Sequence, residues 1–412
     1  MATVPFPDMT TEQGKAAFSG WLSQTNEVTR AFLAAGQIPG LINIAGGLPE
    51  ASVYPSRQIS AIAQQVITDY PAETLGYGPI EGLPDMRSYI AERFSNDTLK
   101  LSADNVLITT SGMQGLDLIG KVLLDEGDPV AVQFPTYLGA LDAWRPRQPK
   151  LRNMDLQTGD FDPFEDMAGA KFAYTVPNFS NPTGKLIGED IRKQLVEAST
   201  ETGAWLLEDD PYGSLNYEGP LPPSALDISS RSQTAELYDG QVVYLGTMSK
   251  LASPGLRIGW AIAAPEMIEA LTLAKQGSDM CTSGITQRIA LEVLKSGIIE
   301  ENQPKVVELY KNRRDALCAA MKEHLSEWFE WEIPEGGMFV WAKARDPRIN
   351  TDRLFKIAIE EKVCISPSSV FDAHGKYNQG IRTNFTLNNE DNLHEAVRRL
   401  AKATQRLLKE AV

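Results

Sequence analysis

The chain has 412 residues, of which 42% are hydrophobic and 23% are charged, and its net charge is −15. A chain of this length and composition can form a large core and about two domains. Its acidity argues against nucleic acid or an anionic membrane as a partner, so we expect neither. Its three scattered cysteines indicate no disulfide framework and fit a reducing cytoplasm, where we predict the protein to be located.

Several kinds of segment and site are not expected. The opening segment, MATVPFPDMTTEQGK, has neither a basic region nor an apolar core, which argues against a secretory signal peptide. No apolar run has the length of a transmembrane helix. The sequence contains neither CxxC nor HExxH, and its three histidines (His324, His374 and His394) are scattered. We therefore predict no metal site.

Helical and strand-like segments alternate through the middle of the chain. Residues 1–48 suggest a polar lead-in with a short helix, and residues 86–99 have the apolar spacing of a helix. Between about residues 100 and 265, helical stretches such as GLDLIGKVLLDEG and EDIRKQLVEASTETG separate strand-like runs. These runs are NVLITT, PVAVQF, KFAYTV, AWLLED, QVVYLG and RIGWAIA. The alternation predicts an α/β fold with a mostly parallel sheet between helices.

The last third of the chain has a different pattern. Long helices are predicted over residues 265–296 and 300–327, followed by the strand-like runs MFVWAKA and GIRTNFTL and a helix in EDNLHEAVRRLAKATQRLL. This mixture predicts a smaller α+β domain. We therefore expect a large domain over residues 49–300 and a small domain formed by residues 1–48 and 301–412.

Polar, aromatic and turn-forming residues follow five of the predicted strands. In chain order these segments are SGMQG, PTY, PNFSNPTG, DDPYG and TMSK. Each segment alone is an ordinary turn or helix cap, because loops are polar by default. In open α/β sheets, however, ligands bind beyond the carboxyl ends of the strands. Five such ends with complementary chemistry therefore predict one binding site.

Lys250 lies between two strands in TMSKLASPGLRIGW, with Arg257 seven residues later. A solvated turn lysine is the commoner interpretation of a single lysine. The alternative is an amine kept for Schiff-base chemistry, with an arginine and hydroxyls around a phosphate. Pyridoxal phosphate uses all five strand ends. Its aldehyde needs a lysine, its ring nitrogen a carboxylate, its ring oxygen an amide and a phenol, and its ring face an aromatic side chain. Its phosphate needs a helix N-terminus, hydroxyls and an arginine. We therefore predict that Lys250 binds this cofactor covalently and that Arg257 anchors its phosphate.

The same motifs, in the same order, resemble those of the class I/II aminotransferases, which are fold type I pyridoxal-phosphate enzymes. The matching segments are YGPIEGLPDMRSYIAE, SGMQGLDL, FPTY, PNFSNPTG, EDDPYG, TMSKLASPGLRIGW and GIRTNFT, and the resemblance covers roughly residues 30–390. The segment NIAGGLPE is most similar to the branch that contains 2-aminoadipate and aromatic aminotransferases. That branch also includes the effector domains of MocR-type regulators.

The resemblance implies a role for each motif. Lys250, Asp209 and Tyr212 are the implied catalytic residues, with Lys250 as the Schiff-base lysine and proton shuttle and Asp209 as the partner of the ring nitrogen. The family spacing Asp-x-x-Tyr selects Asp209 rather than Asp210. The implied cofactor-binding residues are Met113, Gln114, Tyr137, Asn181, Asp209, Tyr212, Thr247, Ser249, Lys250, Arg257 and Tyr77. The implied substrate-binding residues are Arg382, Asn181, Gly47 and Arg30.

Some of these roles carry further implications. Arg382 is similar to the arginine that clamps the substrate α-carboxylate, and Tyr77, together with Thr282, to residues that reach the phosphate of a neighbouring subunit. Arg30 matches an arginine for a distal carboxylate, although a helix-surface charge is an equal alternative. Residues shared between subunits imply a homodimer.

The implied activity moves the amino group of an acidic, long aliphatic or aromatic L-amino acid to 2-oxoglutarate or a similar 2-oxo acid. Two alternatives stay open. One is other chemistry at the same site, such as a pyridoxal-phosphate C–S lyase. The other is a cofactor-binding sensor domain without turnover, although the acidic charge is unsuited to DNA.

Overall fold

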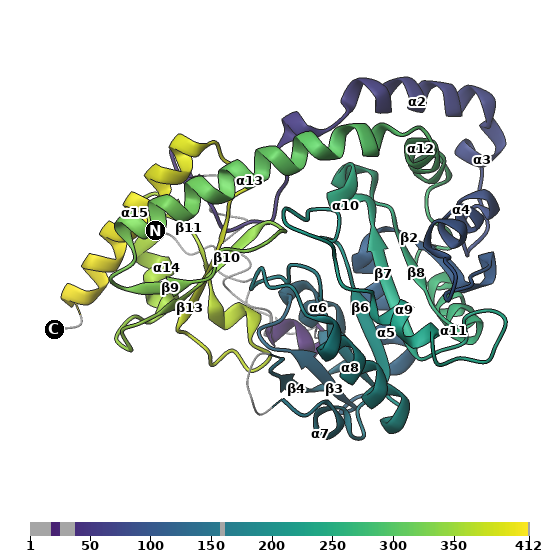
Figure 1. Cartoon of the computed structure of the whole chain (residues 1–412), viewed down its shortest axis with the longest axis horizontal. Coiled ribbons are helices and arrows are strands. Elements are labelled where there is room, and N and C mark those ends of the chain that lie inside the picture. The colour runs from purple at the N-terminus through teal and green to yellow at the C-terminus, as the bar shows by residue number, and fades with distance from the viewer. Residues whose placement is uncertain (1–17, 25–37, 157–160, 411–412) are drawn as a thin grey trace, which may run out of the picture.

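A seven-stranded sheet forms the centre of the larger part of the molecule (Figure 1). The computed structural model describes residues 18–24, 38–156 and 161–410. The strand order is β2-β8-β7-β6-β5-β3-β4. Their bounds are β2 Val106–Thr109, β3 Pro129–Gln133, β4 Lys150–Met154, β5 Phe172–Thr175, β6 Trp205–Asp209, β7 Val242–Thr247 and β8 Gly259–Ile262. Only the pairs that include β8 are antiparallel, so the predicted mostly parallel sheet is confirmed.

Side chains of the strands fill two cores, one on each face of this sheet. In β7, Val243 and Leu245 belong to one core, whereas Val242 and Tyr244 belong to the other. Successive side chains of a strand point to opposite faces, so a strand that is buried on both faces is apolar throughout. This explains why the strand-like runs of the sequence are continuous rather than alternating.

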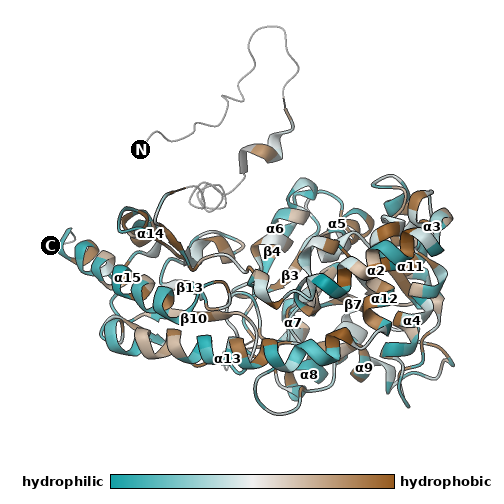
Figure 2. Ribbon diagram, turned by 90° about the horizontal axis from the view of Figure 1, so that it is seen from above, coloured by the Kyte–Doolittle hydropathy of each residue, from teal (hydrophilic) through white to brown (hydrophobic). Residues whose placement is uncertain are grey.

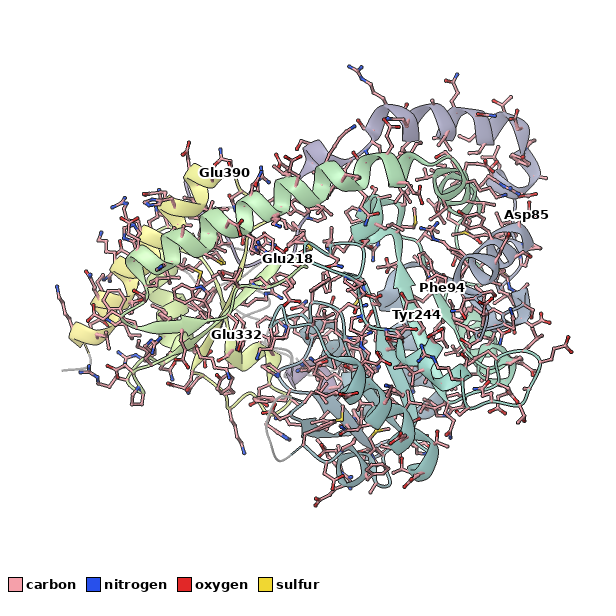
Figure 3. The ribbon with its side chains drawn as sticks, in the orientation of Figure 1. Asp85, Phe94, Glu218, Tyr244, Glu332 and Glu390 are labelled. Carbon is pink, nitrogen blue, oxygen red and sulfur yellow. The ribbon has the colours of Figure 1, made fainter. Side chains whose placement is uncertain are left out.

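Helices cover both faces of the sheet. One face packs against α5 (Ser111–Leu123), α6 (Leu138–Trp144) and α11 (Pro265–Gln276). The other face packs against α4 (Pro84–Phe94), α8 (Glu189–Thr202), α9 (Ala225–Ser230) and α12 (Gly284–Lys295), with α2 (Ser56–Asp69) and α3 (Pro71–Leu75) packed on α12. Figure 3 labels Phe94 of α4 beside Tyr244 of β7, and their ring centroids are 5.1 Å apart.

The smaller part is built on a four-stranded antiparallel sheet of order β12-β13-β10-β9. Its strands are β9 (Phe329–Trp331), β10 (Phe339–Ala344), β12 (Ser366–Pro367) and β13 (Gly380–Asn384), and its helices are α14 (Thr351–Glu360) and α15 (Glu390–Glu410). A parallel pair, β1 (Ile42–Asn43) with β11 (Val363–Cys364), joins the N-terminal segment to it. Hydrophilic and hydrophobic residues interchange along α15 (Figure 2), as expected of a helix with one face on a core.

The long helix α13 (Ile298–His324) extends from the larger part of the molecule to the smaller part (Figure 1). The predicted boundary between residues 300 and 301 falls in the first turn of this continuous helix. None of the described helices is long and apolar enough to cross a membrane.

One element was missed by the sequence prediction, and one was predicted wrongly. The strand β4 was not predicted, because its sequence, KLRNM, is half-exposed and polar at the edge of the sheet. The single helix predicted over residues 265–296 is instead α11 and α12, separated by a loop in which Met280 has a φ of +64°. A β-carbon on Gly284 would meet the carbonyl oxygen of Glu73, so only a glycine allows α12 to start this close to α3.

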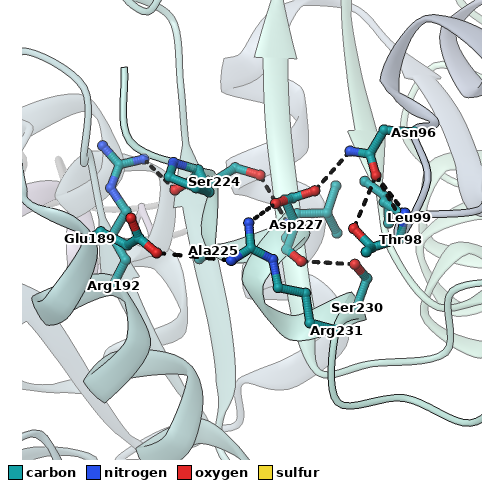
Figure 4. A network of polar contacts seen from close by, with 12 residues as sticks. Asn96, Thr98, Leu99, Glu189, Arg192, Ser224, Ala225, Asp227, Ser230 and Arg231 are labelled. Carbon is teal, nitrogen blue, oxygen red and sulfur yellow. Dashed lines mark hydrogen bonds and ion pairs between the residues drawn. The ribbon is translucent and has the colours of Figure 1, made fainter. Parts of the chain in front are cut away.

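A polar network holds α9 against its neighbours on the outer side of the sheet (Figure 4). The Asp227 carboxylate accepts hydrogen bonds from Arg231 and Asn96, both at 2.7 Å. The hydroxyl of Ser224 caps the helix by accepting a hydrogen bond from the Asp227 backbone N–H at 3.0 Å. Because α9 is short, these contacts fix the position of its N-terminus, which lies next to β6.

Candidate active site

Lys250 lies in α10 (Met248–Leu251), a short helix directly after β7. Its side chain is half-buried, and the Nζ amine donates a hydrogen bond of 2.7 Å to the carbonyl oxygen of Gly47. Burial, with a smaller contribution from the positive charges of Arg382 and Arg257, lowers the pKa of Lys250 to about 8. These are properties of a nucleophilic amine rather than of a solvated turn lysine.

The segment LEDDPYG carries three consecutive carboxylates, and the first has structural partners. Glu208 accepts hydrogen bonds from the backbone N–H groups of Ala225 and Leu226, both at 3.1 Å, at the N-terminus of α9. The guanidinium of Arg192 lies 3.7 Å away, and both side chains are almost fully buried. Ala225 and Arg192 are labelled in Figure 4. Glu208 therefore fastens α9 to the sheet.

The second and third carboxylates also differ from each other. Asp210 accepts hydrogen bonds from the Gly213 backbone N–H at 2.9 Å and from the Tyr244 hydroxyl at 3.1 Å, so it stabilises the turn after β6. Asp209 is buried and accepts a hydrogen bond of 2.8 Å from the Tyr174 hydroxyl on Oδ2. Burial raises the pKa of Asp209 to about 7. A positively charged group beside this carboxylate would stabilise its ionised form.

Asn181, Tyr212 and Arg382 form one chain of hydrogen bonds, although they come from three distant segments. Arg382, on β13, donates from Nη1 to Asn181 Oδ1 at 2.6 Å. Asn181 in turn donates from Nδ2 to the Tyr212 hydroxyl at 3.4 Å. Burial raises the pKa of Tyr212, so its phenol stays neutral and can donate a hydrogen bond.

The Arg382 guanidinium is held between two aromatic rings. Its Cζ atom lies 4.2 Å from the ring centroid of Phe339 and 4.7 Å from that of Phe371. Nη2 donates to the carbonyl oxygen of Ala45 and to the Ser366 hydroxyl, whereas the buried Nε has no hydrogen-bond partner. Burial lowers the pKa of Arg382 to about 10. A planar, buried guanidinium of this kind suits bidentate binding of a carboxylate.

A second group of donors gathers around the N-terminus of α5. Arg257 donates from Nη2 to the Ser111 hydroxyl. The Thr247 hydroxyl donates to the Ser249 hydroxyl at 2.9 Å, at the start of α10. A β-carbon on Gly259 would lie 2.8 Å from the backbone nitrogen that follows Ser111, so a glycine here allows β8 to support the start of α5 closely. Helix N–H groups, hydroxyls and a guanidinium together can hold a phosphate.

Three further predicted cofactor-binding residues lie nearby with different exposures. Tyr137 precedes α6, its hydroxyl is 3.6 Å from the sulfur of Met113, and burial raises its pKa to about 12. Met113 itself is partly exposed. The side-chain oxygen of Gln114 accepts a hydrogen bond of 2.7 Å from the backbone N–H of Thr110. Gln114 therefore uses this oxygen to support the loop before α5.

The remaining predicted residues differ from one another in position and in exposure. Gly47 lies against Phe339, whose ring a β-carbon would meet at 2.7 Å. Tyr77 is on the surface and 90% exposed. Thr282 is buried, and its hydroxyl donates to the carbonyl oxygen of Ile108 at 3.3 Å. Arg30 lies outside the described residues.

Sequence reasoning missed Tyr174 and the rings around Arg382, Phe339 and Phe371. The sequence carried a signal for Tyr174, because a tyrosine in the buried strand KFAYTV needs a partner for its hydroxyl. The partner could not be named, because Asp209 lies on another strand. For Phe339 and Phe371 no signal was available, since buried aromatic residues are common in any core.

The residues present fit pyridoxal phosphate. Lys250 offers a partly neutral amine, Asp209 a buried carboxylate that a cation would stabilise, and Arg257 with the start of α5 a phosphate cradle. The unpartnered Nε of Arg382 leaves a donor for a carboxylate in the same region. A parallel α/β sheet with such a site at the carboxyl ends of its strands defines a fold type I pyridoxal-phosphate enzyme.

Comparisons with known proteins name the family. The family described as "Aminotransferase class I and II" matches residues 51–400, and the chain belongs to it. Aromatic-amino-acid aminotransferase 1 of Thermococcus litoralis is 34% identical over 92% of both chains. The 2-aminoadipate transaminase of Thermus thermophilus is also 34% identical, over 92% of this chain and 94% of its own.

A solved structure agrees with these relatives. The crystal structure of the alpha-aminoadipate aminotransferase of Thermus thermophilus, complexed with N-(5'-phosphopyridoxyl)-L-leucine, superposes with a TM-score of 0.85. It is 32% identical and covers 95% of this chain and 98% of its own. The predicted fold class, cofactor and enzyme class are therefore confirmed: the protein is a pyridoxal-phosphate-dependent aminotransferase that acts on amino acids and 2-oxo acids.

Proposed function

We propose that this aminotransferase takes the amino group of an acidic, long aliphatic or aromatic L-amino acid and passes it to 2-oxoglutarate or a similar 2-oxo acid. The observation that carries this proposal is the buried guanidinium of Arg382 in the same site as the amine of Lys250, whose pKa it lowers. A carboxylate-binding group beside a nucleophilic amine suits a substrate that bears a carboxylate next to its reacting carbon. The names of the relatives support the donor classes.

In this proposal Lys250 has two tasks. Its amine would hold the cofactor covalently in the resting enzyme, and it would move the proton at the substrate Cα once the substrate has displaced it. Pyridoxal phosphate, when bound, supplies the electron sink that stabilises negative charge at that carbon. The pKa of about 8 keeps a useful fraction of the Lys250 amine neutral and ready to accept the proton.

The other proposed site residues would orient the cofactor and the substrate and balance their charges. Asp209, supported by the Tyr174 hydroxyl, would keep the ring nitrogen of the cofactor protonated. Asn181 and Tyr212 would hydrogen-bond the ring oxygen of the cofactor, and their mutual contact keeps both side chains in place. Arg382 would bind the substrate α-carboxylate, with its plane fixed by the two flanking rings.

Absorption spectroscopy of the holoenzyme tests the proposal. We expect a visible band that is lost when a suitable donor amino acid is added and returns with 2-oxoglutarate. The donors to compare are 2-aminoadipate, glutamate, leucine and phenylalanine, with alanine as a short control. A matched Lys250→Ala variant should bind the cofactor without the covalent band and show no turnover; retained turnover would contradict the role of Lys250.

The alternatives are distinct outcomes of the same experiment. Release of ammonia and a 2-oxo acid without an acceptor would indicate elimination rather than transamination. A band that does not respond to any donor would indicate a binding module without turnover. Arg30→Ala tests the distal-carboxylate role, because a variant with full activity on 2-aminoadipate and glutamate would remove that role.

We also propose a homodimer in which Tyr77 reaches the phosphate site of the second subunit. Tyr77 is 90% exposed, and Leu75 (70%) and Met280 (55%) are exposed to smaller degrees. Large apolar side chains this exposed favour burial in an interface. The loop that carries Met280 lies beside the start of α5, since Asp279 accepts a hydrogen bond of 2.9 Å from the Thr110 hydroxyl.

Sedimentation and cofactor-binding measurements test this arrangement. We expect a dimer, and a Tyr77→Phe variant that stays dimeric but releases its cofactor faster. Ile333→Ala is a matched control, because Ile333 is also exposed (60%) but lies in the smaller part of the molecule. A monomeric enzyme with full activity would contradict the proposal. A cytoplasmic location is proposed on the ground that Cys281, Cys318 and Cys364 are all free thiols.

A further inference from the structure

Two of the three histidines of the chain meet at the end of α13, although they are 70 positions apart in the sequence. His324 is the last residue of α13, and His394 lies in the first turns of α15, close to Glu390, which Figure 3 labels. Their ring centroids are 5.0 Å apart. Glu323 lies beside both rings, so a carboxylate and two imidazoles share one place.

The ligand atoms of these three residues have the spacing of a metal site. Nε2 of His324 is 3.7 Å from Oε1 of Glu323, and Nε2 of His394 is 3.6 Å from Oε2 of the same carboxylate. One ligand atom from each of the three residues lies within 4.8 Å of the other two. Tetrahedral zinc, with bonds of about 2.0–2.1 Å to nitrogen and oxygen, places neighbouring ligand atoms about 3.4 Å apart. Small side-chain movements would therefore complete the coordination.

The surroundings of the cluster favour a cation. Nε2 of His324 is buried and has no hydrogen-bond partner, so a polar atom that can donate a lone pair faces the cluster. The side chains of His394 and Glu323 are 51% and 65% exposed, which gives a metal ion access from solvent and leaves room for water ligands. The C-terminal end of α13 adds the negative end of its helix dipole.

We propose that Glu323, His324 and His394 bind one divalent cation of the zinc class. Two imidazole nitrogens and one carboxylate oxygen are the donors that Zn²⁺, Co²⁺, Ni²⁺ and Cu²⁺ prefer, whereas Mg²⁺ and Ca²⁺ prefer oxygen ligands alone. Spacing in the sequence cannot reveal such a site, because its ligands come from two helices. The prediction of no metal site rested on the scattered histidines and on the lack of metal-binding motifs, and this proposal departs from it.

A bound ion would fasten α13 to α15. Both helices pack on the core of the smaller part, and α13 also reaches the larger part (Figure 1). The ion binds only the native arrangement, so it would stabilise that arrangement in proportion to its concentration. None of the three ligands belongs to the residues assigned to the cofactor or the substrate, so the site is separate from the proposed function.

Titration calorimetry of chelator-treated holoenzyme with Zn²⁺ tests the site, together with the visible absorption of bound Co²⁺. We expect one equivalent to bind, and His394→Asn and Glu323→Gln to weaken binding by about 10-fold or more. Both substitutions are at exposed positions, so folding is not at risk. His374→Asn is the matched control, because His374 is exposed and lies outside the cluster.

One outcome of these measurements would support the proposed metal site, and two would contradict it. Binding that is lost in His394→Asn and Glu323→Gln but kept in His374→Asn would establish the site, and a rise in melting temperature with Zn²⁺ should follow the same pattern. Binding that is equal in all variants would place the ion elsewhere and overturn the proposal. Absence of binding to the unmodified enzyme would also overturn it.

Discussion

The acidity of Lys250 can be measured in the cofactor-free enzyme, where the amine is free to titrate. Its pKa is about 8 instead of the ordinary 10.5 because the fold buries it near two positive charges. Lowering the pH below 8 protonates the amine and removes the nucleophile. The rate at which added pyridoxal phosphate becomes covalently attached should therefore rise with pH and level off above about 8.

The size of the effect follows from the two pKa values. At pH 7 a group of pKa about 8 is roughly 9% neutral, whereas a lysine of pKa 10.5 is only about 0.03% neutral. Lys250 should therefore react on the order of 300-fold faster than an ordinary lysine if both amines are equally nucleophilic when neutral. Stopped-flow absorbance from pH 6 to pH 10 measures this rate directly.

A substitution separates the two causes of the low pKa. Arg382→Gln removes one positive charge but leaves Lys250 half-buried, so the midpoint should rise by about one pH unit or less, because burial is the larger cause of the low pKa. Lys250→Ala should show no covalent band at any pH and serves as the blank. A midpoint near 10 in the unmodified enzyme would refute the reasoning, because it would mean that solvent reaches the amine freely.

Two further substitutions test contacts that surround the site. Tyr174→Phe removes a hydrogen bond to ionised Asp209, and such a bond is worth about 1.5–3 kcal/mol. The pKa of Asp209 should therefore rise by about 1–2, and kcat/KM should fall at least about tenfold. An unchanged kcat/KM between pH 6 and pH 9 would contradict the support of Asp209 by Tyr174. Gly47→Ala places a β-carbon 2.7 Å from the ring of Phe339 and should lower the free energy of unfolding by about 1–3 kcal/mol. Gly188→Ala, which has open space, is the control in chemical denaturation, and equal stability of the two variants would contradict the predicted clash.

The sequence predicted the central sheet well because its strands are buried on both faces. Short, continuous apolar runs such as QVVYLG, rich in β-branched and aromatic residues, favour a buried strand in this alternating pattern, and β7 forms from that run. The edge strand β4 escaped detection for the opposite reason, since half of it faces solvent. The start of α12 lies so close to α3 that it requires Gly284, and local periodicity cannot reveal such a tertiary contact.

Residues at strand ends could be proposed for the site from the sequence, whereas the residues that support them could not. Asp209 could be proposed because it ends β6, and Lys250 and Arg257 because they lie between β7 and β8. Each of the three carries a distinctive chemical group. The contact between Tyr174 and Asp209 could not be predicted, because it depends on the register of two neighbouring strands. The contact between His324 and His394 could not be predicted either, since it depends on how two helices pack.

The two shifted pKa values at the centre of the site have a common physical origin. Burial disfavours charge, so it lowers the pKa of Lys250 to about 8 and raises that of Asp209 to about 7. For Lys250 the consequence is a nucleophile near neutral pH. For Asp209 the consequence is a carboxylate that gains more from a cationic partner than a solvated one would, because Coulomb attraction is stronger in a low-dielectric surrounding. A protonated ring nitrogen beside Asp209 should therefore lower its pKa again, and this mutual stabilisation is what would keep the bound cofactor in its electron-withdrawing form.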